Sequence, residues 1–252
     1  MVAGAVNHER PKPEAADQPS AQATIHAAIA RRIGSAILAG ELKPGDCVGG
    51  EIGQSRSMGV SRPAYREAIR LLLAKGLLET RPKSGTHVAP RRRWNLLDPE
   101  VIAWAFAGNP DPRFIRDLLE LRALVEPAAA ALAAQRRSEA ELEEMRAAIA
   151  AMKAHGLNSA AGREADRQFH NSLLAASGNE AFASLSKSIE AAVQWITLYK
   201  KRRDLWRSDL VDEHTAVFEG VAKKDPDAAR QAMSELLGIT LANVKTQFPE
   251  IF

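Results

Sequence analysis

Residues 98–247 form an almost unbroken succession of Ala- and Leu-rich stretches with apolar residues at helical spacing. No segment in this region alternates with period two, so no sheet is expected. Short breaks ("GNPDP", "RRSE", "HGLN", "SGN" and "KKDPD") are caps or turns that divide the region into separate helices. The expected helices are 98–107, 111–135, 138–154, 160–176, 179–202, 206–223 and 226–247. This part of the chain is predicted to be an all-α bundle of six or seven helices.

Residues 21–90 show a different order of elements. Isoleucines recur every four residues over 22–39, which predicts an amphipathic helix. A short helical segment follows, and then a second long helix for which Ser61 is a good N-cap. Residues 77–90 predict two short strands around a Lys-Ser-Gly turn. Helix, short helix, helix and hairpin is the order of a winged helix-turn-helix.

The predicted fold is therefore mainly α and has four parts. Residues 1–20 are rich in Ala, Pro and polar residues and are expected to be a disordered tail. Residues 21–90 form the winged helix-turn-helix, and residues 91–97 are a linker that contains "RRRWN". Residues 98–247 form the helical domain.

Composition narrows the class of protein. The chain is 46% hydrophobic and 26% charged, as is usual for a soluble globular protein. No apolar run approaches the roughly 20 residues of a membrane span, and the N-terminus has no secretory signal pattern. The single cysteine, Cys47, excludes an internal disulfide and fits a reducing compartment. We expect a cytoplasmic protein with no membrane partner.

Positive charge is concentrated in the N-terminal part. Residues 21–93 contain 13 Lys and Arg against 5 Asp and Glu, whereas residues 94–252 carry a net charge of −4. A basic segment joined to an acidic one indicates that one part meets a polyanion. A solvated basic surface is the alternative that charge alone leaves open.

The second long helix begins with residues suited to reading DNA. In a helix-turn-helix, the first residues of this helix reach base edges in the major groove. Arg62 and Arg66 are four residues apart and project from one face, and the arginine fork matches guanine O6 and N7. The Lys83–Gly85 turn places a wing against the sugar-phosphate backbone. The candidate DNA contacts are Ser61, Arg62, Tyr65, Arg66, Lys83 and Gly85. The alternative is that the arginines form surface pairs with Glu67 and Glu79.

Several motifs of the chain resemble a known family. "ILAGELKPGD", "GVSRPAYREAIRLLLAKGLLE" and "SGTHVAP" resemble the N-terminal domain of GntR-type bacterial transcriptional regulators. The resemblance places four residues at the family's DNA-contacting positions: Ser61, Arg62, Arg66 and Gly85. Ile52 departs from the family pattern, because a basic residue is usual there. "LRALVEPAAAALAA", "ADRQFHNSLLAASGN" and "DEHTAVFEGVAKKDPDAARQAM" resemble the helical (FCD) ligand domain of the FadR branch.

The resemblance implies a homodimeric regulator that binds a palindromic double-stranded DNA operator and a small carboxylate effector. "APRRRWNLLDPEVIAWAF" and "LRALVEPA" are also similar to galactonate-responsive repressors of sugar-acid operons. That likeness implies a repressor released by an aldonate such as D-galactonate. The alternatives are a different hydroxy acid or a dicarboxylate, and, more remotely, a metal-dependent enzyme. The sequence contains no nucleophile motif and no obvious general base beside Asp166, His170 and His214, so no catalytic residue is expected.

Many members of the family bind a divalent metal through an aspartate, a histidine one turn later and two further histidines. By this resemblance, Asp166, His170 and His214 are the first three ligands, and Leu236 stands at the fourth position. A mixed nitrogen and oxygen set suits a divalent cation, with zinc the first choice. Three interpretations stay open: a metal site with three protein ligands, a metal-free effector pocket, and plain structural contacts.

Arg122 is the remaining candidate for effector binding. It lies in a strongly apolar helix, where an unpaired charge is unfavourable. By the resemblance it receives the effector's carboxylate, for which a bidentate pair is the expected geometry. The alternative is a salt bridge to Glu126, one turn further on. The candidate effector-binding residues are Arg122, Asp166, His170 and His214.

Overall fold

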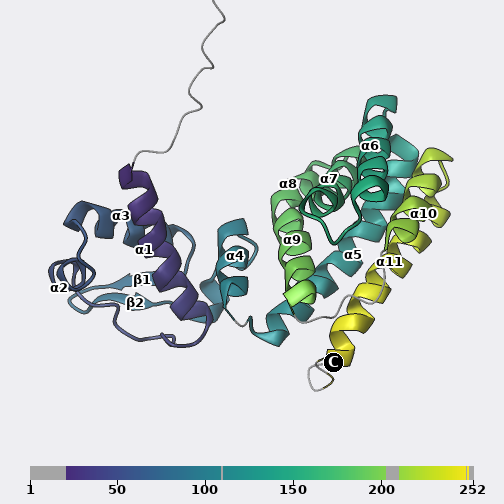
Figure 1. Ribbon diagram of the computed structural model, residues 1–252. Helices are drawn as coiled ribbons and strands as arrows, with labels where there is room; N and C mark the ends of the chain where they lie inside the picture. Colours follow the sequence, from purple (N-terminus) through teal and green to yellow (C-terminus); the bar gives the residue numbers. More distant parts are fainter. Residues whose placement is uncertain (1–20, 109, 203–209, 248, 250–252) are drawn as a thin grey trace, which may run out of the picture.

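The computed structural model of the protein describes residues 21–108, 110–202, 210–247 and 249. The expected tail, residues 1–20, and the start of the helix expected at 206–223 lie outside them. Figure 1 shows a small N-terminal lobe and a larger helical lobe. The predicted fold class, a winged helix-turn-helix followed by an all-α bundle, is confirmed.

The N-terminal lobe contains three helices and a hairpin. Its elements are α1 (Ala21–Leu38), α2 (Glu51–Ser57), α3 (Arg62–Ala74), β1 (Leu78–Arg81) and β2 (Gly85–Val88). The strands are antiparallel, with Leu78 opposite Val88 and Arg81 opposite Gly85. In this arrangement α2 and α3 are the helix-turn-helix and the hairpin is the wing.

The isoleucine stripe of α1 supplies much of the core of this lobe. Ile29, Ile33 and Ile37 are buried in one cluster with Leu72 of α3. Ile25, one turn earlier on the stripe, is 44% exposed. The stripe therefore buries three of its four members, and its first residue lies beyond the packed interface.

Both ends of α3 follow local rules. Ser61 is its N-cap, and the Ser61 hydroxyl accepts a hydrogen bond from the Ala64 amide at 3.3 Å. Gly76 follows the last turn with a φ of 70°, in the left-handed region that favours glycine. A Cβ added at Gly76 would also collide with the backbone oxygen of Arg93. The helix therefore begins where the sequence predicts, and it ends at a glycine that the turn and the close backbone both require.

The larger lobe is a bundle with seven helices among the residues described. They are α5 (Pro112–Arg136), α6 (Glu139–His155), α7 (Ala160–Ala176), α8 (Glu180–Ser184), α9 (Ser186–Arg202), α10 (Val211–Ala222) and α11 (Pro226–Gln247). The single helix expected over 179–202 is wrong, because the chain breaks at Leu185 between α8 and α9. No glycine or proline marks this break, so the pattern did not show it.

Helix α7 occupies the centre of the bundle. It packs against α5, α6 and α9, while α11 packs against α5 and α10. Polar side chains on the inner face of α7 are therefore removed from water. None of the described helices is long and apolar enough to span a bilayer.

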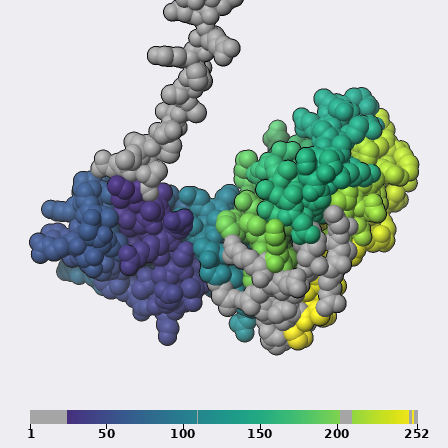
Figure 2. All heavy atoms as spheres, in the orientation of Figure 1, coloured from purple at the N-terminus to yellow at the C-terminus, as the bar shows by residue number. Residues whose placement is uncertain are grey.

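Helix α4 (Pro99–Ala107) joins the two lobes. It packs against α1 on one side and α9 on the other, and Figure 2 shows it in teal between the lobes. Gly34 of α1 allows the close approach, because a Cβ there would collide with the Trp104 ring of α4. The Ser35 hydroxyl donates a hydrogen bond to the Trp104 carbonyl at 3.3 Å. A movement of α9 can therefore reach α1 through α4.

Gly162→Ala is expected to lower the free energy of unfolding by about 3 kcal/mol or more. The added Cβ would collide with the backbone oxygen of Gly156 at the junction of α6 and α7. Neither backbone group can move without displacing a helix. Gly238→Ala in α11 is the control, since nothing lies within 4 Å of its Cβ, and it should gain about 1 kcal/mol. Urea unfolding measures both, and equal stability of the two variants would contradict the prediction.

Candidate functional site

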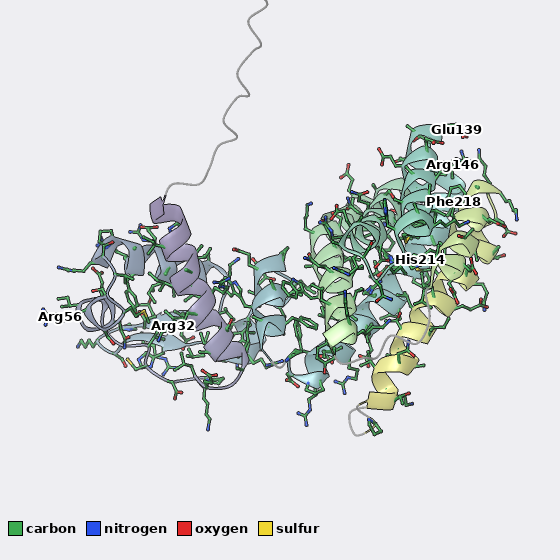
Figure 3. All side chains as sticks on the ribbon, in the orientation of Figure 1. Arg32, Arg56, Glu139, Arg146, His214 and Phe218 are labelled. Carbon is green, nitrogen blue, oxygen red and sulfur yellow. The ribbon has the colours of Figure 1, made fainter. Side chains whose placement is uncertain are left out.

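The structure brings the predicted aspartate and two histidines together inside the bundle. Helix α7 carries Asp166 and His170 one turn apart, and α10 carries His214; all three side chains are buried. Asp166 Oδ1 lies 2.9 Å from His214 Nε2 and 3.4 Å from His170 Nε2. One possible ligand atom from each residue lies within 4.8 Å of the others. Figure 3 shows His214 within the helical lobe.

His214 is held in the orientation of a metal ligand. Its Nδ1 lies 2.6 Å from the Leu210 carbonyl oxygen, which only accepts, so Nδ1 carries the proton. Its Nε2 is buried and makes no hydrogen bond to any described residue, although the Asp166 carboxylate is close. The Nε2 lone pair of His214 and the Asp166 carboxylate oxygen lie close enough for both to bind the same cation.

His170 is supported from behind by a carboxylate. His170 Nδ1 lies 2.5 Å from Glu126 Oε2, and Glu126 is 0% exposed. A ligand histidine in proteins is usually oriented through its other nitrogen in this way. Glu126 is thus a supporting residue of the site.

Arg122 completes the buried network. Its Nε lies 2.5 Å from Glu126 Oε1, and its terminal nitrogen lies 3.5 Å from His170 Nε2. The salt bridge that the sequence left as the alternative is therefore present. Arg122 also lines the cavity above Asp166, so the pairing and a role toward a ligand are compatible.

The charges of the network set its protonation states. Burial raises the pKa of Glu126, but the charges of Arg122 and His170 outweigh it and lower that pKa to about 2. Burial also raises the pKa of Asp166, and the two histidines hold it well below its ordinary value. Burial lowers the pKa of His170, yet Glu126 and Asp166 raise it to about 9. Both carboxylates are therefore ionised near neutral pH.

A cavity of about 30 Å³ lies among these groups. Its walls include Arg122, Asp166, His170, Lys200, His214 and Leu236. Leu236 thus lies beside the cluster, at the place where the family resemblance puts a fourth ligand, and its side chain has no donor atom. The described site therefore offers three candidate ligand residues, and an apolar side chain stands at the fourth position.

Lys200 was missed by the sequence reasoning. Helix α9 places Val193, Ile196, Thr197 and Lys200 along the cavity, at the spacing of one helical face. Burial lowers the pKa of Lys200 to about 8, against the opposing effect of Asp166. The helical spacing puts Lys200 on the buried face of α9, but that spacing does not show which cavity the face lines.

The predicted DNA-contacting arginines lie on the exposed side of α3. The Arg62 and Arg66 side chains are 61% and 50% exposed. Arg62 Nε lies 3.1 Å from Glu51 Oε1, and an Arg66 nitrogen lies 4.0 Å from Glu51 Oε2. Exposed pairs of this kind contribute about 0–1 kcal/mol, so both guanidinium groups can exchange Glu51 for a DNA acceptor.

The sequence left open that Arg62 and Arg66 pair with Glu67 and Glu79, but these glutamates pair with other arginines. Glu67 pairs with Arg70, and Glu79 pairs with Arg81 and Arg93. Neither glutamate is the partner found for the two arginines at the start of α3.

Tyr65 does not share the exposed face of α3. Its side chain is 2% exposed and belongs to the core of the N-terminal lobe. The prediction that Tyr65 contacts DNA therefore needs correction. Tyr65 precedes Arg66 by one residue, and that one-residue step around the helix turns its side chain toward the core. Lys83 is exposed at the tip of the wing with a φ of 61°, and Gly85 follows with a φ of 90°.

Comparison with known proteins identifies the family. The gntR family of bacterial regulatory proteins matches residues 25–88, and the FCD domain matches residues 117–238. The galactonate operon transcriptional repressor of Escherichia coli (strain K12) is 32% identical, over 84% of this chain and 93% of its own length. The chain belongs to the GntR family.

Other relatives agree with this membership. The uncharacterized HTH-type transcriptional regulator YieP of E. coli (strain K12) is 33% identical to this GntR regulator, over 89% of this chain and 97% of its own. The solved structure of Lar, which controls expression of the Listeria monocytogenes agr system, matches with a TM-score of 0.65 and 19% identity. That match covers 92% of this chain and 99% of the other, and at this identity it shows the fold alone. The matched domains are those of DNA-binding transcriptional regulators, so the protein is not an enzyme, as predicted.

Proposed function

We propose that this GntR regulator represses a sugar-acid catabolic operon and is released from its operator by a small carboxylate, an aldonate such as D-galactonate. The observation that carries the proposal is the buried cluster of Asp166, His170 and His214 beside Arg122. All four of these side chains line a single cavity, from α5, α7 and α10. The galactonate operon repressor is a relative of this chain. The protein acts as a homodimer, with one winged domain (21–90) per half-site and residues 98–247 for effector binding and dimerisation.

The cluster fits a divalent cation, with zinc the first choice. Asp166 and the Nε2 atoms of His170 and His214 would hold it, because His214 Nε2 has no other partner among the described residues. A bound cation would supply an open coordination position for an effector oxygen. Arg122 then receives the effector's carboxylate, and Lys200 adds a second positive charge to the same cavity.

The effector must widen this cavity to bind. A volume of about 30 Å³ holds an ion or a water molecule, whereas small-molecule sites are about 300–1,000 Å³. The walls that can yield are apolar, since Val193 and Ile196 of α9 face Leu236 and Leu237 of α11. Effector binding therefore displaces α9 relative to α11.

Displacement of α9 reaches the DNA-binding lobe through α4. The Ser188 hydroxyl of α9 donates a hydrogen bond to the Leu97 carbonyl at 2.6 Å, just before α4 begins. On its other side α4 packs against α1 at Gly34 and Trp104. A coupling free energy of about 1–3 kcal/mol is sufficient to release the operator.

The proposal is tested by thermal shift with a panel of aldonates, uronates and dicarboxylates. Metal-stripped protein is compared with the same protein after zinc is added. We expect one aldonate to raise the Tm, and zinc to enlarge that rise. Equal stabilisation without zinc would favour a metal-free pocket. If only a dicarboxylate stabilises the protein, the effector is a dicarboxylate and not an aldonate. If none of the acids raises the Tm, the effector assignment is contradicted.

Leu236→His is expected to raise zinc affinity by at least roughly tenfold, the size of effect that even supporting contacts have at metal sites. The new imidazole enters a cavity already lined by the other three ligands. Competition with a chromogenic chelator measures the change. Leu237→His, on a neighbouring wall of the same cavity, is the control for adding a histidine. Equal gains in both variants, or no gain at position 236, would contradict the assignment of the fourth position.

A further inference from the structure

A second cavity lies in the N-terminal lobe, apart from the effector cluster. Its volume is about 330 Å³, and it lies between α3 and the wing. Its walls include Cys47, Gly49, Tyr65, Arg66, Gly85 and Thr86. A cavity of this volume can hold a molecule considerably larger than water.

Two polar groups at this cavity are unused by the fold. Cys47 is a free thiol and is exposed. The Tyr65 hydroxyl is buried and has no hydrogen-bond partner among the residues that the structure describes. Burial raises the pKa of Tyr65, and the neighbouring Cys47 acts in the same direction, so the hydroxyl keeps its proton. A buried donor of this kind requires an acceptor, and the described part of the chain does not supply one.

The local charge favours an anion. Arg66 and Glu51 both line the cavity. The Glu51 carboxylate is already held by Arg62 at 3.1 Å, and Arg66 lies 4.0 Å from its other oxygen. Arg62, which lies outside the cavity lining, thus offsets the charge of Glu51, and the Arg66 charge remains at the cavity that Cys47 also lines.

We propose that this cavity is a thiol-modification site, in which Cys47 forms a mixed disulfide with an anionic low-molecular-weight thiol. The Cys47 thiol gives its proton to solvent, and the thiolate attacks one sulfur of a symmetrical small disulfide. The protein–ligand S–S bond forms as the original S–S bond breaks, and the departing thiolate takes up a proton. The small disulfide is the oxidant. In the product, a ligand carboxylate faces Arg66 and a ligand oxygen accepts the Tyr65 hydrogen bond.

The adduct would lie between the recognition helix and the wing. Arg66 and Gly85, two of the proposed DNA contacts, both line the cavity. An anionic occupant neutralises Arg66 and repels phosphate, so the modified protein releases DNA. This consequence rests on the proposed DNA contacts, whereas the modification itself does not.

The site is tested first without DNA, by intact-protein mass spectrometry after timed exposure to glutathione disulfide or to cystamine, a cationic disulfide. Relative to the urea-unfolded chain, the folded protein should favour glutathione disulfide by about fivefold, the effect of one charge about 4 Å away in water. Arg66→Gln should abolish this preference, and Cys47→Ser should form no adduct. Tyr65→Phe keeps the ring but should speed removal of the glutathione adduct by dithiothreitol. The same ratio in folded and unfolded protein, or a preference unaffected by Arg66→Gln, would overturn the proposal.

The regulatory consequence is tested with the duplex that reduced protein selects from a random pool. The glutathione adduct should lower affinity for this duplex at least about tenfold, and dithiothreitol should restore it. Cys47→Ser, exposed to the same disulfide, should keep full affinity. An adduct that binds the duplex normally would overturn the regulatory role. Failure of reduced protein to select any duplex would instead contradict the proposed function, while the charge preference would still be measured.

Discussion

Arg62→Ala and Arg66→Ala should each lower affinity for the selected operator by about 5- to 150-fold, or about 1–3 kcal/mol. The two side chains are 61% and 50% exposed on α3, and Glu51 is the carboxylate that each would exchange for a guanine edge. Affinity for random-sequence DNA should fall much less, because base contacts specify and phosphate contacts position. Fluorescence anisotropy with the specific and the random duplex measures both quantities.

Arg31→Ala provides the matched control. It removes the same charge from α1, on the side that lies beside Glu100 and Trp104 of α4. Its effect should be small and equal for the two duplexes. If Arg31→Ala reduced specific binding as strongly as the α3 variants, net charge rather than base contact would explain all three. Circular dichroism confirms that each variant is folded.

Arg122→Met should lower the free energy of unfolding by about 3 kcal/mol and abolish the effector response. The substitution leaves the fully buried Glu126 carboxylate with His170 as its remaining cationic neighbour. Loss of one partner of a buried pair is strongly destabilising because the other charge stays out of water. Urea unfolding measures the stability, and thermal shift with the responsive aldonate measures binding.

A double variant separates the structural role of Arg122 from its role in binding. Arg122→Met with Glu126→Gln removes both charges, and the glutamine oxygen still faces His170 Nδ1. Most of the lost stability should return, but the aldonate should still give no shift. Recovery of both stability and effector response would mean that Arg122 serves only to neutralise Glu126.

Much of this protein is determined locally in the chain. The N-cap at Ser61, the end of α3 at Gly76 and the helical periodicity of the bundle depend on residues that are neighbours in sequence. Asp166 and His170 share a face because four residues make about one turn. These features are therefore readable from the sequence, and the resemblance to GntR regulators supplied the pairing with His214.

Three features were not readable in this way. Tyr65 was expected at the DNA but is buried in the core, because the packing of α1 and the wing decides which side of α3 faces water. The break at Leu185 carries no local signal. Lys200 reaches the effector cavity only because α9 packs beside α7, which no spacing along the chain specifies.

The sequence determined the order of the helices apart from the break at Leu185, the basic N-terminal lobe and, through the family resemblance, three candidate metal ligands. Only the tertiary structure decided that Glu126 holds both Arg122 and His170, that Leu236 closes the cavity, and that α4 connects α9 to α1. The physical reason is the distance along the chain over which each interaction acts. Caps and periodicity depend on hydrogen bonds and contacts within one turn, whereas the charges of the buried network meet only after helices distant in sequence have packed and excluded water.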